Sequence, residues 1–237
     1  MPYNTQTING NTSDEAIKVK TKALIFNDQG GLCAFCESTI QENEKQRVEH
    51  FHPKSGTQNH NWALDWANVM GVCFGGSDVD KSIHPLPANL SCDAYKDHLI
   101  TKKQLPCDCE GYLLNPLKIP AFPCLFDFDK RTGALKAKKD YGQLQIGENT
   151  YASVSELVEK TIETLNLNCD RLMKDRLAVL YQYNQTIKKA REHDDHDVFS
   201  KLAERWLQKK WLSFFTTRRV LLGEHAEKLL KNQKFQG

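Results

Sequence analysis

Hydrophobic positions follow a helical period only in the second part of the chain. After about residue 150, apolar residues recur at intervals of three and four, which indicates amphipathic helices. Three such stretches are predicted, over 153–165, 169–191 and 197–232, and Gly223 is expected to bend or end part of the third. This part of the chain is therefore expected to be a helical region.

The first part of the chain is much less periodic. A helix is predicted over 14–28, where apolar positions are partly periodic, and the glycines that follow end it. From 31 to about 123 the pattern is irregular, with short strand-like pieces and many glycines and prolines. Residues 126–146 are typical of a hairpin that turns at 131–133. We predict an α+β fold that changes character near residue 150.

The composition is that of an ordinary globular protein. Hydrophobic residues make up 40% of the 237 residues and charged residues 26%, which excludes a fibrous or globally disordered chain. The net charge is +2, so any surface that binds nucleic acid must be local. No apolar run reaches the ~18–20 residues of a membrane span. Residues 1–18 lack an apolar signal core, so we expect a cytoplasmic protein with no membrane association.

The eight cysteines are the first candidates for chemistry, because a reducing cytosol favours thiols and metal ligands over disulfides. Cys33 and Cys36 have the two-residue gap of a zinc knuckle, although two unrelated buried thiols can share that spacing. Cys73 and Cys92 each follow an apolar, strand-like approach, and Gly75-Gly76 permits a knuckle turn. We predict a structural Zn²⁺ site formed by Cys33, Cys36, Cys73 and Cys92, with no open position for water.

Two other assignments of metal ligands stay open at this point. In the first, His50 joins three of the cysteines and leaves Cys92 free. In the second, Cys107, Cys109 and Cys124 form another site or substitute in the first, the alternative being plain thiols.

The sequence Val-Glu-His-Phe-His-Pro-Lys-Ser at 48–55 lies between the two halves of the predicted zinc site. With the cysteine pairs it resembles the HNH nuclease family, whose core runs C-x-x-C, acid-His-x-x-Pro, Asn, and then C-x-x-C followed by Asn or His. The counterparts in this chain are 33–36, 49–53, Asn68 and 92–96. The chain departs from the family in two ways: eighteen residues separate Cys73 from Cys92, and Asp93 stands where Asn or His is usual.

The order of these motifs, followed by Leu-Leu-Asn-Pro at 113–116 and Glu-Thr-Leu-Asn-Leu-Asn at 163–168, is similar to PtuB-type nucleases of Septu and retron anti-phage systems. The resemblance implies a zinc-stapled ββα-metal core of the HNH or His-Me finger type within residues 1–150. It implies a C-terminal helical region, residues 151–237, for packing or partner docking. The implied partners are nucleic acid, a PtuA-like ABC/SMC-type ATPase, and a retron reverse transcriptase with its msDNA.

The residue types in the motif suit hydrolysis of a phosphodiester, which needs a base for water and a divalent cation to stabilise charge. An imidazole has an ordinary pKa near 6.5, so His50 suits the base at neutral pH. Glu49, on the other side of the strand, would hold Mg²⁺ or Mn²⁺ together with Asp93. Asp97, one helical turn after Asp93, is a candidate third ligand, with a solvated helix residue as the alternative.

Other residues of the motifs are expected to position the base or bind the substrate. By resemblance to the family, Asn68 braces the loop that carries the base. Lys54 and Lys96 are predicted phosphate contacts. His52 is a predicted nucleic-acid contact, with simple solvent exposure as the alternative. DNA and RNA, including tRNA, both stay open as substrates.

A competing hypothesis is a non-catalytic, zinc-dependent module for nucleic-acid binding or assembly. A binding module of this kind has no need of the acid–histidine pair at 49–50 or of the nearby Asp93, so the nuclease hypothesis is favoured. In the helical region, basic and aromatic residues alternate over 209–219. This pattern suits either a nucleic-acid contact or a stripe of core aromatics among solvated cations.

Overall fold

The structure is a computed structural model that describes residues 11–40, 46–54, 60–208 and 210–235. Ser55 of the motif and Lys209 lie outside the described residues. In chain order the elements are α1 (Asn11–Asp28), β1 (Arg47–His50), the 3-10 helix η1 (Trp66–Asn68), β2 (Val69–Val72), α2 (Cys92–Thr101), β3 (Phe126–Phe128), β4 (Leu135–Ala137), α3 (Val154–Thr164), α4 (Asp170–Glu192), α5 (Val198–Leu207), α6 (Phe215–Leu222) and α7 (Glu224–Asn232). This mixture of helices and two small sheets confirms the α+β expectation.

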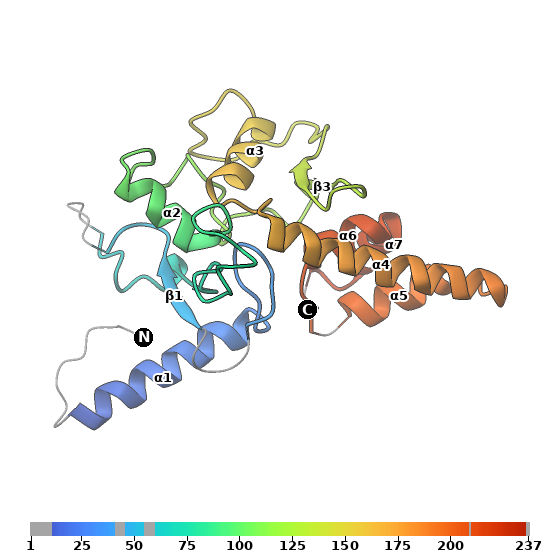
Figure 1. Cartoon of the computed structure of the whole chain (residues 1–237), viewed down its shortest axis with the longest axis horizontal. Helices are drawn as coiled ribbons and strands as arrows, with labels where there is room; N and C mark the ends of the chain where they lie inside the picture. The colour runs from blue at the N-terminus through green and yellow to red at the C-terminus, as the bar shows by residue number, and fades with distance from the viewer. Residues whose placement is uncertain (1–10, 41–45, 55–59, 209, 236–237) are drawn as a thin grey trace.

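The strands β1 and β2 form a two-stranded antiparallel sheet, and α2 is the next element along the chain (Figure 1). In the register, Glu49 lies opposite Met70 and His50 opposite Val69. Helix α1 packs on β2, where the ring of Phe26 lies 2.7 Å from the position of a Cβ on Gly71. Only glycine fits under that ring without a shift, so this site fixes how α1 meets the sheet.

The predicted helices of the second part are confirmed with one change. Ser153 caps α3 by accepting a hydrogen bond from the backbone N–H of Glu156, and α4 runs to Glu192. The third predicted stretch is divided into α5, α6 and α7, with breaks at 208–214 and at Gly223. The predicted hairpin is also shorter, because its paired strands β3 and β4 leave 138–146 without a strand.

One hydrophobic core runs through both parts of the chain. It includes Met70 and Val72 of β2, Leu157 of α3, Leu172 of α4 and Trp206 of α5. Helix α4 packs on α6, and α5 packs on both α6 and α7. In Figure 1, α1 extends to one side of the molecule and the α4–α5 pair extends to the opposite end. The basic and aromatic stretch is largely core, since Phe214, Phe215, Arg218 and Arg219 are buried.

The helical region holds the cysteine-bearing turn at 33–36 through Glu37. The Glu37 carboxylate accepts hydrogen bonds from the backbone N–H of Thr216 at 2.9 Å and from its hydroxyl at 2.5 Å. The carbonyl of Glu37 also accepts the backbone N–H of Phe214 at 2.9 Å. The first turn of α6 is therefore attached to the residue that directly follows Cys36.

The α3–α4 connection holds the other cysteine-bearing segment. The backbone N–H of Cys92 donates to the carbonyl of Leu165 at 2.8 Å. The side-chain amide of Asn166 donates to the carbonyls of Ala88 and Leu90 at 2.8 and 2.7 Å. The residues 163–168, which the sequence singled out as a motif, thus support the start of α2.

Replacing Glu37 with alanine is expected to lower the free energy of unfolding by about 2–3 kcal/mol, because two hydrogen bonds to a charged group are lost. Chemical denaturation of the purified protein measures the change. Glu163→Ala is the matched control, since the exposed carboxylate of Glu163 pairs with Lys160 on the surface. An equal stability of Glu37→Ala and the unchanged protein would contradict the role given to Glu37.

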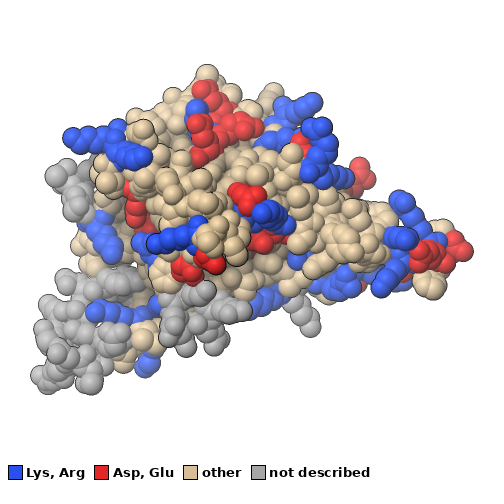
Figure 2. Space-filling view, in the orientation of Figure 1, with Lys and Arg blue, Asp and Glu red and all other residues tan. Residues whose placement is uncertain are grey.

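On the face of the molecule that Figure 2 draws, charges of both signs are present. On the side drawn in Figure 2, basic and acidic side chains are interspersed among uncharged ones. This agrees with the small net charge and means that binding of a polyanion depends on local groups. Within the described residues, no helix has the length and apolar character needed to cross a membrane.

Candidate active site and metal centre

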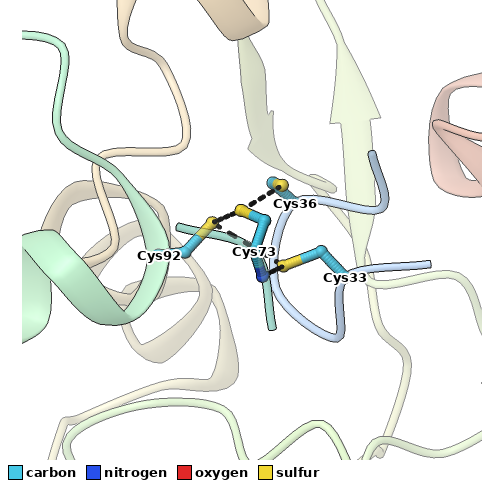
Figure 3. Close-up of side chains that lie close together, drawn as sticks. All are labelled: Cys33, Cys36, Cys73 and Cys92. Atoms are coloured by element: carbon cyan, nitrogen blue, oxygen red, sulfur yellow. Dashed lines mark hydrogen bonds between the residues drawn. The ribbon is translucent and has the colours of Figure 1, made fainter. Parts of the chain in front are cut away.

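The four predicted cysteine ligands converge on one point. Their sulfur atoms all lie within 4.8 Å of one another and point toward each other in Figure 3. The sulfurs of Cys36 and Cys73 are 3.7 Å apart, those of Cys73 and Cys92 are 3.8 Å apart, and those of Cys33 and Cys92 are 3.9 Å apart. Tetrahedral zinc with Zn–S bonds near 2.3 Å separates its sulfurs by about 3.8 Å.

Local backbone geometry creates this arrangement. The backbone N–H of Cys73 donates to the sulfur of Cys33 at 3.4 Å, and the N–H of Gly75 donates to the sulfur of Cys73 at 3.3 Å. Gly75 has a φ of +61°, and a Cβ there would lie 2.1 Å from the carbonyl oxygen of Ser91. The expected turn after Cys73 therefore requires glycine.

The chemistry of the cluster suits a soft metal ion. Hydrogen bonds with the other three thiols hold the pKa of Cys73 well below its usual range. A thiolate is the form that binds metal, and a set of four matches a structural zinc site. The cluster could hold a metal such as zinc, and the segment carrying α2 would then be fixed to the turn at 33–36.

A second cluster brings charged residues from β1 and α2 together. The Lys96 ammonium forms ion pairs with both Glu49 and Asp93, the latter at 3.2 Å. The guanidinium of Arg47 lies 3.1 Å from the other oxygen of Asp93. Arg47 and Glu49 are two positions apart on β1 and therefore share one side of the strand. The structure thus places the two predicted carboxylate ligands around one cation.

Burial and the neighbouring charges change the pKa values of the groups in this cluster. Burial, and secondly the charge of Asp93, raise the pKa of Glu49 to about 7. Burial alone would lower the pKa of Lys96, but the charges of Glu49 and Asp93 hold it above its ordinary value. The two carboxylates therefore require a positive charge between them, and in this structure the ammonium of Lys96 supplies it.

His50 is the last residue of β1 and lies next to Glu49 along the chain. Alternation along the strand directs its side chain away from the side that Arg47 and Glu49 share. The residue is buried, and burial, together with the charge of Lys54, lowers the pKa of its imidazole. A backbone hydrogen bond with Ala63 acts in the opposite sense. The ring is consequently unprotonated at neutral pH, as a base must be.

Asn68 holds the chain that follows His50. Its side-chain oxygen accepts the backbone N–H of His52 at 2.7 Å, and its amide donates to the carbonyls of His52 and Trp62, each at 3.0 Å. Asn68 is itself buried at the end of η1. These bonds fit the bracing role that the family resemblance implies for it.

His52 lies in the interior and does not reach the surface where a nucleic-acid contact was expected. Its ring stacks on Trp62 with 3.9 Å between centroids. Its Nδ1 is 3.1 Å from Asp108, and its Nε2 is 3.0 Å from Glu110. With both nitrogens beside carboxylates and little exposure, His52 attaches the motif to residues 108–110.

The remaining predicted site residues are more scattered. Lys54 is exposed, whereas Lys96 is buried against carboxylates and is not open to a phosphate. Asp97 is exposed one turn after Asp93, and the four cysteines are the only group of three or more possible ligands found within the described residues. Among the described residues, Cys107, Cys109 and Cys124 therefore do not form a second cluster of this kind.

Sequence reasoning missed Arg47. The available signal was its position two residues before Glu49 on a predicted strand, which puts both side chains on the same side.

Comparison with known proteins gives one informative relative. The chain is 39% identical over 209 residues to an Escherichia coli protein named "Retron Ec83 putative HNH endonuclease", and the match covers 86% of this chain and 79% of the relative. No protein-family model matches the chain. The extent of the match covers the region of β1, β2 and α2 together with most of the helical part.

Proposed function

The chain belongs to the HNH endonuclease family, enzymes that hydrolyse phosphodiester bonds, and its relative is assigned to a retron. From this relationship we propose that it is a metal-dependent nuclease with a ββα-metal core formed by β1, β2 and α2. The observation that carries the proposal is the meeting of Glu49 and Asp93 around the ammonium of Lys96. His50 directly follows Glu49 in the chain, and Asp93 directly follows Cys92 of the four-thiol cluster.

The proposed reaction assigns a distinct role to each residue. His50 accepts a proton from the attacking water, and Asn68 keeps the following chain in place for it. Glu49 and Asp93 hold a Mg²⁺ or Mn²⁺ ion, and exposed Asp97 is a further candidate ligand. When bound, that ion would stabilise negative charge on the phosphate and on the leaving oxygen. Lys54 is the exposed lysine of the motif and a candidate backbone contact.

The four cysteines are proposed to hold a structural Zn²⁺. Four thiolates complete a tetrahedral shell, so this ion would take no part in hydrolysis. Residues 1–150 would supply the catalytic groups, and residues 151–237 would support both cysteine-bearing segments through Glu37 and the 163–168 connection.

The retron relationship supports a role in anti-phage defence. We propose nucleic acid as substrate, with both DNA and RNA to be tested, and retron components as partners. A PtuA-like ATPase is the proposed partner that keeps the nuclease inactive until infection. Co-purification from cells that carry the neighbouring genes, followed by sequencing of cleaved nucleic acid, tests these assignments together.

Removal of a carboxylate ligand tests the proposed metal dependence. Asp93→Ala is expected to lower Mg²⁺-dependent cleavage of DNA or RNA roughly a hundredfold, since metal stabilisation of charge is worth several kcal/mol. Asp93→Asn keeps an oxygen donor and the residue type common in the family, so it should retain more activity than alanine.

The matched control is Asp127→Ala, which removes a carboxylate paired with Lys136 on the distant β3–β4 hairpin. Melting curves check that each variant is folded. Cleavage by Asp93→Ala at the rate of the unchanged protein, or cleavage that persists in a chelator of Mg²⁺, would refute the proposed ion site.

A further inference from the structure

The charged cluster contains two cations with different access to solvent. The side chain of Lys96 is 6% exposed, whereas that of Arg47 is 38% exposed. Lys96 is engaged with both carboxylates, so it serves as their internal counterion. Resting on the proposed nuclease function, we propose that Arg47 is the residue of this cluster that binds the backbone phosphate of the substrate.

The position of Arg47 suits this task. It begins β1 on the side that Glu49 shares, and its guanidinium contacts Asp93 from the more open edge of the cluster. In the proposed function, the phosphate to be cleaved must come to Glu49 and Asp93. A guanidinium 3.1 Å from Asp93 therefore lies beside the place that this phosphate must reach.

The chemistry of the guanidinium also fits. It carries five N–H donors in a rigid plane, so a contact with one carboxylate oxygen leaves other donors for a phosphate. Its fork matches two phosphate oxygens at once, which a lysine cannot do. Because charges on the surface of Figure 2 are mixed, a single well-placed cation should contribute measurably to binding.

A purely structural role for Arg47 makes a different prediction. In that case Arg47 only neutralises Asp93, and its loss would alter folding or the state of Asp93 without changing the number of phosphates bound. The salt dependence of binding distinguishes phosphate binding from a purely structural role. For duplex DNA, the slope of log affinity against log salt concentration is proportional to the number of phosphate contacts.

The experiment uses full-length, zinc-loaded protein in a His50→Ala background, so that the probe stays uncut. Fluorescence anisotropy measures binding to a labelled 20-base-pair DNA duplex and to a tRNA over a range of salt. R47M is expected to weaken binding roughly tenfold and to reduce the slope of log affinity against log salt by about one. R47K should recover the slope, because it restores one positive charge.

Arg131→Met is the matched control, because Arg131 is a highly exposed arginine in the distant β3–β4 turn and should leave affinity and slope unchanged. An unchanged slope in folded R47M, or no salt-dependent binding of either probe by the background protein, overturns the assignment of Arg47. Cleavage by His50→Ala at the unchanged rate would instead refute the proposed base, so the two failures are distinguishable.

Discussion

Replacing His50 with alanine is expected to lower the rate of phosphodiester cleavage by about 10²–10⁴-fold, the usual effect of removing a general base. The measurement is the initial rate of cleavage of plasmid DNA and of tRNA in the presence of Mg²⁺ or Mn²⁺. Binding of the uncut probe should change little, because the proposed role of the imidazole is to accept a proton and not to hold the backbone.

The environment of His50 is the reason for a large effect. Burial lowers the pKa of the ring, which leaves it unprotonated at neutral pH. The residue is also the end of β1, and Asn68 fixes the chain directly after it through three hydrogen bonds. A base that is held in the reactive geometry accelerates the reaction more than a base on a mobile loop, so its removal lowers the rate more.

A matched control separates this effect from a general loss of histidine. His193→Ala alters an exposed histidine just after α4, far along the chain from the proposed site, and should leave the rate unchanged. Melting temperatures of both variants show whether each is folded. If folded His50→Ala cleaves as fast as the unchanged protein, His50 is not the base.

Much of the site could be predicted from the sequence because its ligands follow rigid local rules. The two-residue gap between Cys33 and Cys36 fits one turn, and Gly75-Gly76 allows the turn after Cys73. Local spacing alone does not assign Cys92 to the same cluster, because eighteen residues separate it from Cys73. The helices α3 and α4 were predictable from their period, whereas the break at 208–214 was not, because apolar residues continue through it.

The surroundings of Lys96 and His52 could not be predicted, because they depend on tertiary contacts. Lys96 has the spacing of a phosphate contact in the sequence, but the folded chain buries it between Glu49 and Asp93. His52 precedes a lysine in an exposed-looking motif, yet Trp62 and two distant carboxylates enclose it. No local pattern encodes which segment, tens of residues away, will cover a side chain.

The four-cysteine cluster gives the prediction with the largest effect on stability. Cys33→Ser is expected to abolish cooperative folding at 25 °C, with loss of bound zinc. Structural zinc sites contribute on the order of 10 kcal/mol, which is comparable to the whole stability of a domain. Among the described residues of 31–123, the regular elements are β1, η1, β2 and α2, so this region has little regular structure to compensate.

Zinc content by mass spectrometry and the near-ultraviolet circular dichroism of the purified protein measure the outcome. Cys107→Ser is the control, because Cys107 is exposed and does not belong to the four-thiol cluster.

A strong zinc chelator should unfold the unchanged protein in the same way, and added Zn²⁺ should restore it. Because Cys92 begins α2, the loss of the ion should also release Asp93 and Lys96 from their partners on β1. If Cys33→Ser stays folded without zinc and still cleaves nucleic acid, the cluster is not what holds the site together.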